Sequence, residues 1–215
     1  MRETEGASGT VRPRVDADNV VGNVYDKYGT RNPIARAMMS GFLDAVTSLF
    51  DQAAPTSVLE VGCGEGRLAH HLVTRATRRP ERFLASDVSL GNRAPDLDGG
   101  IEWREASIYE LPFETNSFDL VVCCEVLEHL EHPAEGLAEL SRVANEKVLL
   151  STPWEPVWRA LNMARGKYWR DLGNTPGHIQ HFTRRGLLEL ARRQLDIRAV
   201  RRPLPWTVLL GDVRR

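Results

Sequence analysis

The sequence predicts an α/β fold in which a mostly parallel sheet carries helices on both faces. Two observations predict it. Short apolar runs alternate with segments of helical spacing, and the run Phe118–Cys124 is apolar almost throughout, which is typical of a parallel strand buried on both faces. The 215 residues, 42% hydrophobic and 27% charged, are enough for one domain around one core.

The first half of the chain alternates helix and strand. Between Asn32-Pro33 and Pro55, apolar residues recur at spacings of three and four, which predicts an amphipathic helix. The short apolar runs Ser57–Val61 and Arg82–Ser86 are predicted strands, and Gly66–Ala76 between them has helical spacing.

The second half continues this alternation and indicates βαβ units with right-handed crossovers. Pro133–Val143 is a predicted helix because its proline suits a first helical turn, and Thr183–Gln194 has strong helical spacing. The remaining predicted strands are Ile101–Arg104, which is weak, Phe118–Cys124, which is the strongest, Lys147–Thr152, Asp196–Arg202 and Trp206–Arg214.

Charge and cysteine usage narrow the class of protein. Residues 151–215 carry thirteen Arg or Lys and five Asp or Glu, a net charge of +8, against −9 for the first 150. These basic residues occur singly or in pairs, which favours a solvated surface over a nucleic-acid-binding tail, although an anionic substrate or a membrane surface would also suit them. Cys63, Cys123 and Cys124 form no disulfide framework and no zinc spacing, so we expect no metal site.

The hydropathy predicts no membrane span, and the usage of the three cysteines suits a reducing cytoplasm, so a cytoplasmic protein is expected. No apolar run reaches the 18 residues or so of a membrane span, and the first residues lack the apolar stretch of a signal peptide. Residues 1–18 are polar, and we expect a flexible tail there, followed by one domain over residues 19–215. Neither a monomer nor a homodimer is favoured by the sequence.

The sharpest motif is a strand that runs directly into a glycine-rich turn, VLEVGCGEG at residues 58–66. Gly62 permits a tight turn, and Gly64 lets the backbone approach a ligand closely. The pattern is not a P-loop, and its third glycine comes one residue early for the dinucleotide fingerprint. A nucleotide-phosphate site remains a competing interpretation, because a helix N-terminus binds anions.

Two acids point to a different ligand. Glu60, at the end of its strand, can face a cationic amino group, which S-adenosylmethionine has and NAD lacks. Asp87 lies 21 positions beyond Gly66, at the end of the second strand, where an acid can accept hydrogen bonds from ribose hydroxyls. The alternative for Asp87 is a turn or capping residue. The S-adenosylmethionine hypothesis requires both acids on one side of the sheet.

The runs LEVGCGEGRLAHHL, ASDVS and SIYELPFETNSFDLVVCCEVLEHL, in this order, resemble the class I S-adenosylmethionine-dependent methyltransferases. Within that class they are similar to the small-molecule group typified by ubiquinone and menaquinone biosynthesis enzymes. The resemblance covers about residues 57–152 and weakens towards residue 195. It implies a Rossmann-like, doubly wound, seven-stranded sheet whose last strand, at Trp206–Arg214, is antiparallel.

The resemblance also implies a set of cofactor contacts. Many relatives have Asp where Ser107 stands, which weakens the expected contact with the adenine amino group. Val24-Tyr25-Asp26-Lys27-Tyr28 resembles an N-terminal tyrosine motif that closes over the cofactor, and a simple packing pair of tyrosines is equally open. The implied cofactor-binding residues are Glu60, Gly62, Cys63 and Gly64 for the methionine part, the Cys124 backbone for its amino group, Asp87 for the ribose, Ser107 and Ile108 for the adenine, and Tyr28 as a closing residue.

Methylation of a hydroxyl or an activated carbon also needs a base, and a neutral histidine is the natural one near pH 7. His129 follows the fourth strand and is expected to face the cleft, where the family often has His. His178 ends an aromatic segment above the same opening. We predict His129 and His178 as catalytic residues, with Glu128 as a fallback base. Structural roles at helix ends are the alternative for each histidine.

Residues 153–182 interrupt the alternation and hold five of the fifteen aromatic residues. Long insertions in compact domains are usually binding loops or lids, so this one predicts a substrate lid over an aromatic or lipid-like acceptor. Arginines there would suit a phosphate or carboxylate, and a satellite core under the lid is the alternative. The predicted lining residues are Trp158, Arg159, Tyr168, Trp169, Arg170 and His181.

The sequence therefore predicts a methyltransferase that acts on the oxygen or carbon of a small molecule. An RNA or protein methyltransferase is the alternative, but no Asn-Pro-Pro-Tyr run follows the fourth strand and no basic block is present, so no nucleic-acid partner is expected. An inactive S-adenosylmethionine-binding protein is the third possibility, and its expected sign is a damaged glycine turn. Here that turn is intact.

Overall fold

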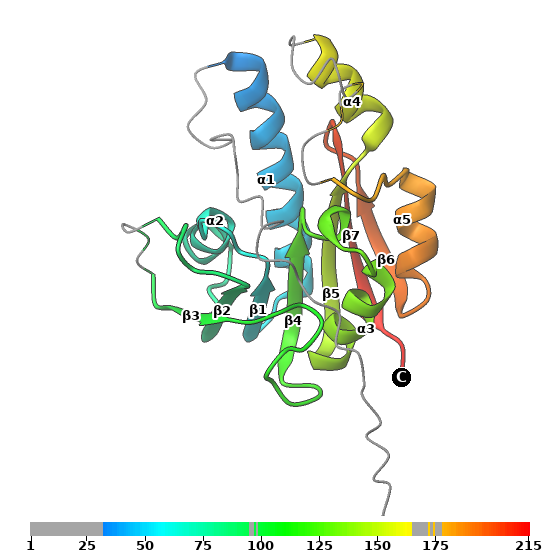
Figure 1. The fold of residues 1–215 in the computed structure, drawn as a ribbon. Helices are drawn as coiled ribbons and strands as arrows, with labels where there is room; N and C mark the ends of the chain where they lie inside the picture. Colours follow the sequence, from blue (N-terminus) through cyan, green and yellow to red (C-terminus); the bar gives the residue numbers. More distant parts are fainter. Residues whose placement is uncertain (1–31, 95–96, 98, 165–171, 173, 175–177) are drawn as a thin grey trace, which may run out of the picture.

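The computed structural model describes residues 32–94, 97, 99–164, 172, 174 and 178–215. Within these ranges seven strands form one sheet in the order β3-β2-β1-β4-β5-β7-β6 (Figure 1). Strand β7 is antiparallel to both β5 and β6, and the other pairs are parallel, so the seven-stranded, doubly wound sheet with an antiparallel last strand is confirmed. The strands are β1 Ser57–Val61, β2 Arg82–Asp87, β3 Ile101–Glu105, β4 Phe118–Cys124, β5 Ala144–Pro153, β6 Leu195–Arg201 and β7 Trp206–Val213.

Helices cover both faces of the sheet (Figure 1). One core cluster unites α1 and α2 with the strand residues on their side, and a second cluster unites α3 and α5 with those on the other. The cap of α1 follows the predicted pattern, because the Asn32 side chain accepts from the N–H groups of Ile34 and Ala35. The helices are α1 Pro33–Ala53, α2 Arg67–Arg75, α3 Pro133–Val143, α4 Glu155–Ala164 and α5 Arg184–Ala191, with a short 3-10 turn, η2, at Leu127–His129.

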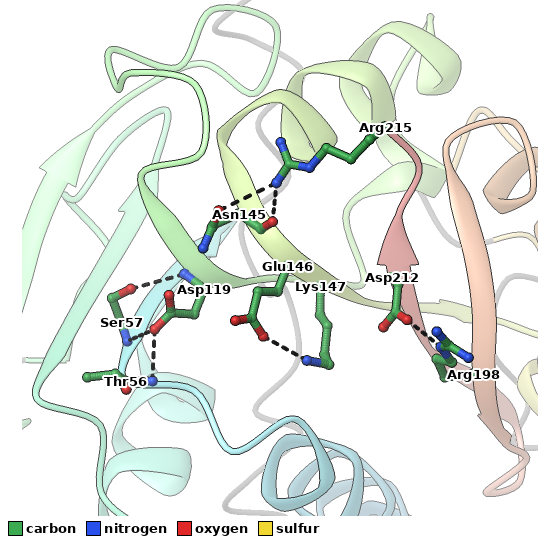
Figure 2. Close-up of polar contacts among 9 residues, drawn as sticks. All are labelled: Thr56, Ser57, Asp119, Asn145, Glu146, Lys147, Arg198, Asp212 and Arg215. Atoms are coloured by element: carbon green, nitrogen blue, oxygen red, sulfur yellow. Dashed lines mark hydrogen bonds and ion pairs between the residues drawn. The ribbon is translucent and has the colours of Figure 1, made fainter.

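The central strands β1 and β4 are fastened together at their amino ends. Oδ2 of Asp119 accepts from the backbone N–H groups of Thr56, at 3.0 Å, and Ser57, at 2.9 Å, and the Ser57 hydroxyl accepts from the Asp119 N–H (Figure 2). Burial raises the pKa of Asp119, but these hydrogen bonds outweigh it and hold the pKa below its usual value. This clamp fixes the register of the two strands whose opposite ends carry the candidate site.

Several element bounds differ from the sequence-based expectation, and α5, for example, ends at Ala191 rather than Gln194. Helix α4 occupies the start of the 153–182 segment, where no helix was predicted. Strand β5 runs from Ala144 to Pro153 rather than from Lys147 to Thr152. None of the helices within the described ranges combines the length and apolar character needed to cross a bilayer. The predicted tail at residues 1–18 lies outside those ranges.

Candidate active site

The candidate site lies at the carboxyl ends of β1, β2 and β4. Strand β1 pairs with β2 on one side and with β4 on the other, so the chain reverses its winding direction there. Ligands of open α/β sheets bind in the crevice outside such a switch point. The register pairs Glu60 with Ala85, and Asp87 lies two residues beyond Ala85, so both acidic side chains leave the sheet on the face covered by α1 and α2.

The three glycines of the turn between β1 and α2 all have positive φ, and they differ in their surroundings. A Cβ on Gly62 would lie 2.2 Å from Cγ2 of Val126, and one on Gly66 would lie 2.3 Å from Cη2 of Trp103. A Cβ on Gly64 would meet nothing within 4 Å. Gly62 and Gly66 are therefore required for packing, whereas Gly64 presents bare backbone to open space.

Backbone hydrogen bonds fix this turn against the end of β2. The N–H groups of Gly62 and Cys63 both donate to the carbonyl of Ser86, at 2.8 and 3.0 Å. The N–H of Gly64 donates to Oδ2 of Asp87 at 2.8 Å. Asp87 thus stabilises the turn, as the capping alternative proposed, and it stands at the strand end where a ribose contact was predicted. Its other oxygen, Oδ1, accepts from the Ser89 N–H at the long distance of 3.5 Å.

Glu60 is almost fully buried, with 2% of its surface exposed. The backbone N–H of Ala69 in α2 partly offsets the cost of burying this carboxylate, and one of its oxygens, Oε2, is buried without a hydrogen-bond partner among the described residues. Burial and the negative charge of Asp87 raise the pKa of Glu60 to about 8. A buried acid with one unsatisfied oxygen fits a site that gains a cationic group on ligand binding.

The other predicted cofactor residues take defined positions at the same edge. Burial raises the pKa of the Cys63 and Cys124 thiols, so both remain protonated near neutral pH and neither is an activated nucleophile. The Ser107 hydroxyl accepts from the Tyr109 N–H at 3.3 Å. Ile108 is 5% exposed and packs in the cluster beneath α3, which leaves its backbone rather than its side chain for a ligand. Tyr28 lies outside the described residues.

The predicted catalytic histidines lie together. The ring centroids of His129, in η2, and His178 are 4.9 Å apart, with the rings nearly perpendicular. Nδ1 of His178 lies 2.7 Å from Oε1 of Glu155, and both side chains are buried. Glu128, the fallback base, is also buried beside them. His181 is exposed instead, and its Nε2 lies 3.0 Å from Oδ1 of Asn174.

Backbone contacts explain how residues so far apart in sequence meet. The N–H groups of Ile179 and Gln180 both donate to the carbonyl of Glu128, at 3.0 and 2.9 Å. The N–H of Glu155 donates to the carbonyl of Phe182 at 3.1 Å. The described ends of the 153–182 segment are thereby attached to η2 and to each other. Gly62 also lies directly against the Val126 side chain, and this contact links the glycine turn to the segment that carries His129.

The sequence did not single out Glu125 or Glu155. Glu125 directly follows β4 with φ 61°, a left-handed conformation that is rare outside glycine. Its carboxylate accepts from the Ser151 hydroxyl at 3.1 Å and from Nε1 of Trp206 at 2.7 Å. Backbone strain of this kind concentrates at functional sites. The only available sequence signal was its place directly after the strongest strand.

Trp158 and Arg159 are the described members of the predicted acceptor lining. Trp158 is partly buried between the ring of Trp206, at a centroid distance of 5.7 Å, and the ring of His178, at 6.5 Å. It packs against the core, as the satellite-core alternative expects, while it still borders His178. Nε of Arg159 donates to the Leu172 carbonyl at 3.0 Å. Tyr168, Trp169 and Arg170 lie outside the described residues.

Comparisons with known proteins agree with this geometry. Residues 59–151 match the family model described as a methyltransferase domain. The chain is 36% identical over 90 residues to a ubiquinone biosynthesis O-methyltransferase of Hahella chejuensis, an alignment that covers 40% of this chain and 38% of the relative. It is 31% identical over 133 residues to the enzyme of the same name from Xanthomonas oryzae pv. oryzae, covering 60% of this chain and 55% of the relative. The matches thus span about half the length of these relatives or less.

A solved structure shares the fold across most of the chain. Magnesium protoporphyrin IX methyltransferase from Synechocystis PCC 6803, with bound S-adenosylhomocysteine, superposes with a TM-score of 0.62 at 16% identity. The superposition covers 86% of this chain and 90% of that one. Residues 59–151 are therefore similar to the methyltransferase domain family, and the sheet around them shares the Rossmann-like fold of that solved structure.

Proposed function

We propose that this chain binds S-adenosylmethionine and transfers its methyl group to a small-molecule acceptor. One observation carries the proposal. Glu60 and Asp87 lie on the same face of the sheet, on either side of a glycine turn in which Gly64 alone faces open space. The buried, unsatisfied Oε2 of Glu60 suits the cationic amino group of the ligand, and Asp87 at the end of β2 suits its ribose.

When bound, the cofactor supplies an electrophilic sulfonium methyl group, and the protein supplies position and electrostatics. Gly64 would carry the methionine part, with the Cys124 backbone at the end of β4. Ser107 and the backbone of Ile108 would flank the adenine, and Tyr28 would close over the site. An acceptor oxygen or carbon held about 3–3.5 Å from the methyl carbon gains several kcal/mol from orientation alone.

The proton of an acceptor hydroxyl must leave during the reaction. The described residues best placed to handle it are His129 and His178, with Glu128, because they stand at the carboxyl end of β4 next to the glycine turn. The 153–182 segment would cover the acceptor, with Trp158 as the described aromatic wall and an aromatic or lipid-like acceptor as the preferred class. Three thiols and no disulfide among the described residues suit a reducing cytoplasm.

Isothermal titration of the full chain with S-adenosylmethionine and S-adenosylhomocysteine tests the first half of the proposal. Saturable binding is expected, and it should weaken in Asp87→Asn but not in Asp44→Asn, an exposed acid of α1. Absence of binding would refute the proposal. A tritiated-methyl assay against pooled metabolites and against RNA tests the second half. Label in RNA would favour a nucleic-acid methyltransferase instead, and label in neither would favour a binding protein without activity.

A further inference from the structure

Helix α3 holds the backbone of the segment between β3 and β4. Oε1 of Glu139 accepts from the Leu111 N–H at 2.8 Å. The Arg142 guanidinium donates to the carbonyl of Leu111, at 3.0 Å, and to that of Phe113, at 2.9 Å. The two side chains also bind each other in a fork, because Nε and Nη2 of Arg142 each donate to one oxygen of Glu139 at 2.7 Å. One pair of side chains thus fixes three backbone groups of this segment.

We propose that Glu139 and Arg142 are positioning residues for the adenine base of S-adenosylmethionine, and that the backbone of residues 107–113 recognises that base. This role rests on the proposed function, because it concerns the same cofactor site. Neither side chain would touch the cofactor, and both would act through the segment that they hold. A base that is recognised by backbone groups needs such support, because hydrogen bonds weaken steeply when donor and acceptor lose their alignment.

The side chains that would flank the base are already engaged. The Ser107 hydroxyl accepts from the Tyr109 N–H at 3.3 Å. The Ile108 side chain packs against α3, where a Cβ on Gly136 would lie 3.4 Å from its Cδ1. The N–H and the carbonyl of Ile108 bind no other residue in the described ranges, so both are available to a ligand. Adenine offers a matching acceptor at N1 and a donor at its amino group.

The alternative is that the pair contributes only to stability. Burial raises the pKa of Glu139, but Arg142 and the Leu111 N–H outweigh it and hold that pKa below its usual value, so the pair is ionised near neutral pH. An ion pair between residues three apart on one helix contributes little by itself. Here Arg142 also reaches carbonyls 29 and 31 positions away in the chain. A stabilising role and a positioning role predict different ligand selectivity.

Selectivity between two ligands tests this role. The full chain is titrated by calorimetry with S-adenosylhomocysteine and with S-inosylhomocysteine, in which an oxo group replaces the adenine amino group and N1 carries a hydrogen. The two ligands differ only at the edge of the base that a backbone N–H and carbonyl would contact. The unaltered chain should prefer S-adenosylhomocysteine by about tenfold or more. Arg142→Lys keeps the charge but loses the fork, and it should bring this preference below about threefold.

Two further variants complete the test. Arg185→Lys is the matched control, because Arg185 also binds a glutamate of its own helix, Glu189, but at an exposed surface of α5, and it should leave the preference unchanged. Glu139→Gln keeps an acceptor for the Leu111 N–H, so it should reduce the preference less than Arg142→Lys does. It replaces Arg142→Lys if circular dichroism shows that the latter fails to fold.

The outcomes separate the two roles and the two proposals. Equal loss of affinity for both ligands in a folded variant overturns the positioning role, and failure of both α3 variants to fold does so in favour of a purely stabilising one. An unaltered chain that binds both ligands equally well also overturns it, while the proposed function stands. If the unaltered chain binds neither ligand, the proposed function itself is refuted, and the positioning role is refuted with it.

Discussion

The N–H of Gly64 donates to Oδ2 of Asp87 at 2.8 Å, so the turn after β1 and the acid after β2 form a single unit. The same glycine has open space where a side chain would stand. One residue therefore both anchors the acid and exposes its own backbone. The effects of substitutions on cofactor binding and on stability can therefore be measured separately. Packing at Gly62 and Gly66 governs stability, whereas the exposed backbone of Gly64 is available to a ligand.

Asp87→Ala is expected to weaken S-adenosylhomocysteine binding by tenfold or more, because a charged hydrogen-bond acceptor is worth roughly 1.5–3 kcal/mol. The variant should also lower the free energy of unfolding by about 1 kcal/mol, since the Gly64 N–H loses its partner. Calorimetry and urea denaturation measure the two effects. Asp44→Ala is the control, and unchanged affinity in Asp87→Ala would contradict the assignment of this acid to the cofactor.

Alanine substitutions at Gly62 and Gly64 should affect different properties, with the first lowering stability most and the second lowering cofactor affinity most. Gly62→Ala is expected to cost about 2–5 kcal/mol of stability, because it adds a strained positive φ and an overlap with Val126. Gly64→Ala has only the backbone strain of about 1–2 kcal/mol, so it should fold but bind cofactor poorly. Denaturation and titration are measured for both. Val126→Ala combined with Gly62→Ala should restore part of the lost stability, and equal destabilisation by both alanines would contradict this interpretation.

Glu60 predicts a specific pH dependence. Its pKa of about 8 lies above the ordinary glutamate value of 4.5, so the folded protein binds more protons than the unfolded chain between these pH values, and stability falls as pH rises through that window. Glu60→Gln should therefore stabilise the free protein at pH 8, by about 1–3 kcal/mol, and flatten this dependence. Thermal melting from pH 5 to 9 measures it, and a destabilised Gln variant at pH 8 would be inconsistent.

The same residue links cofactor binding to proton release. A cationic amino group next to Glu60 favours the ionised form, so binding near pH 7 should release a proton and affinity should rise towards pH 8. Calorimetry in two buffers of different ionisation enthalpy measures the number of protons released. Glu60→Gln should release none from this position. Equal proton release in both forms would place the linkage elsewhere.

Trp206→Phe keeps an aromatic ring against Phe42 and Trp158 but removes the Nε1–H that donates to Glu125. We expect a loss of about 1–3 kcal/mol of stability, because a part-buried carboxylate oxygen loses a donor. Phe42→Leu is the comparison, since it disturbs the same ring contacts without touching that hydrogen bond. If both variants lose the same stability, packing alone explains the position and the Glu125 contact contributes little.

The sequence predicted the central part of the fold well, because local signals there agree with the tertiary structure. The bounds of β1, β4 and α3 coincide with the predicted ones, since apolar runs buried on both faces and a proline at the first helical turn are unambiguous signals. Helix α4 was missed because Pro153 and Pro156 surround its start, and its tryptophan suggested a binding loop instead of a helix face.

The candidate site was predictable only in part for a related reason. Glu60, Gly64 and Asp87 lie at strand ends, where topology alone brings them to one edge. Glu155 gave no such signal, because its role depends on contact with His178 across a segment without periodicity. The approach of His178 to His129 depends on two backbone bonds to the Glu128 carbonyl, and any residue except proline could supply those N–H groups.

The hydrogen bond from the Glu155 N–H to the Phe182 carbonyl joins the first residues of the 153–182 segment to its last residue. Because backbone groups hold both described ends of the segment, side chains between them can change without loosening either attachment, provided that Trp158 keeps its packing against the core. On the proposed function, variation in this segment that spares Trp158 would alter which molecules are methylated while the groups next to the glycine turn keep their places. Acceptor choice and methyl transfer would then be separately adjustable.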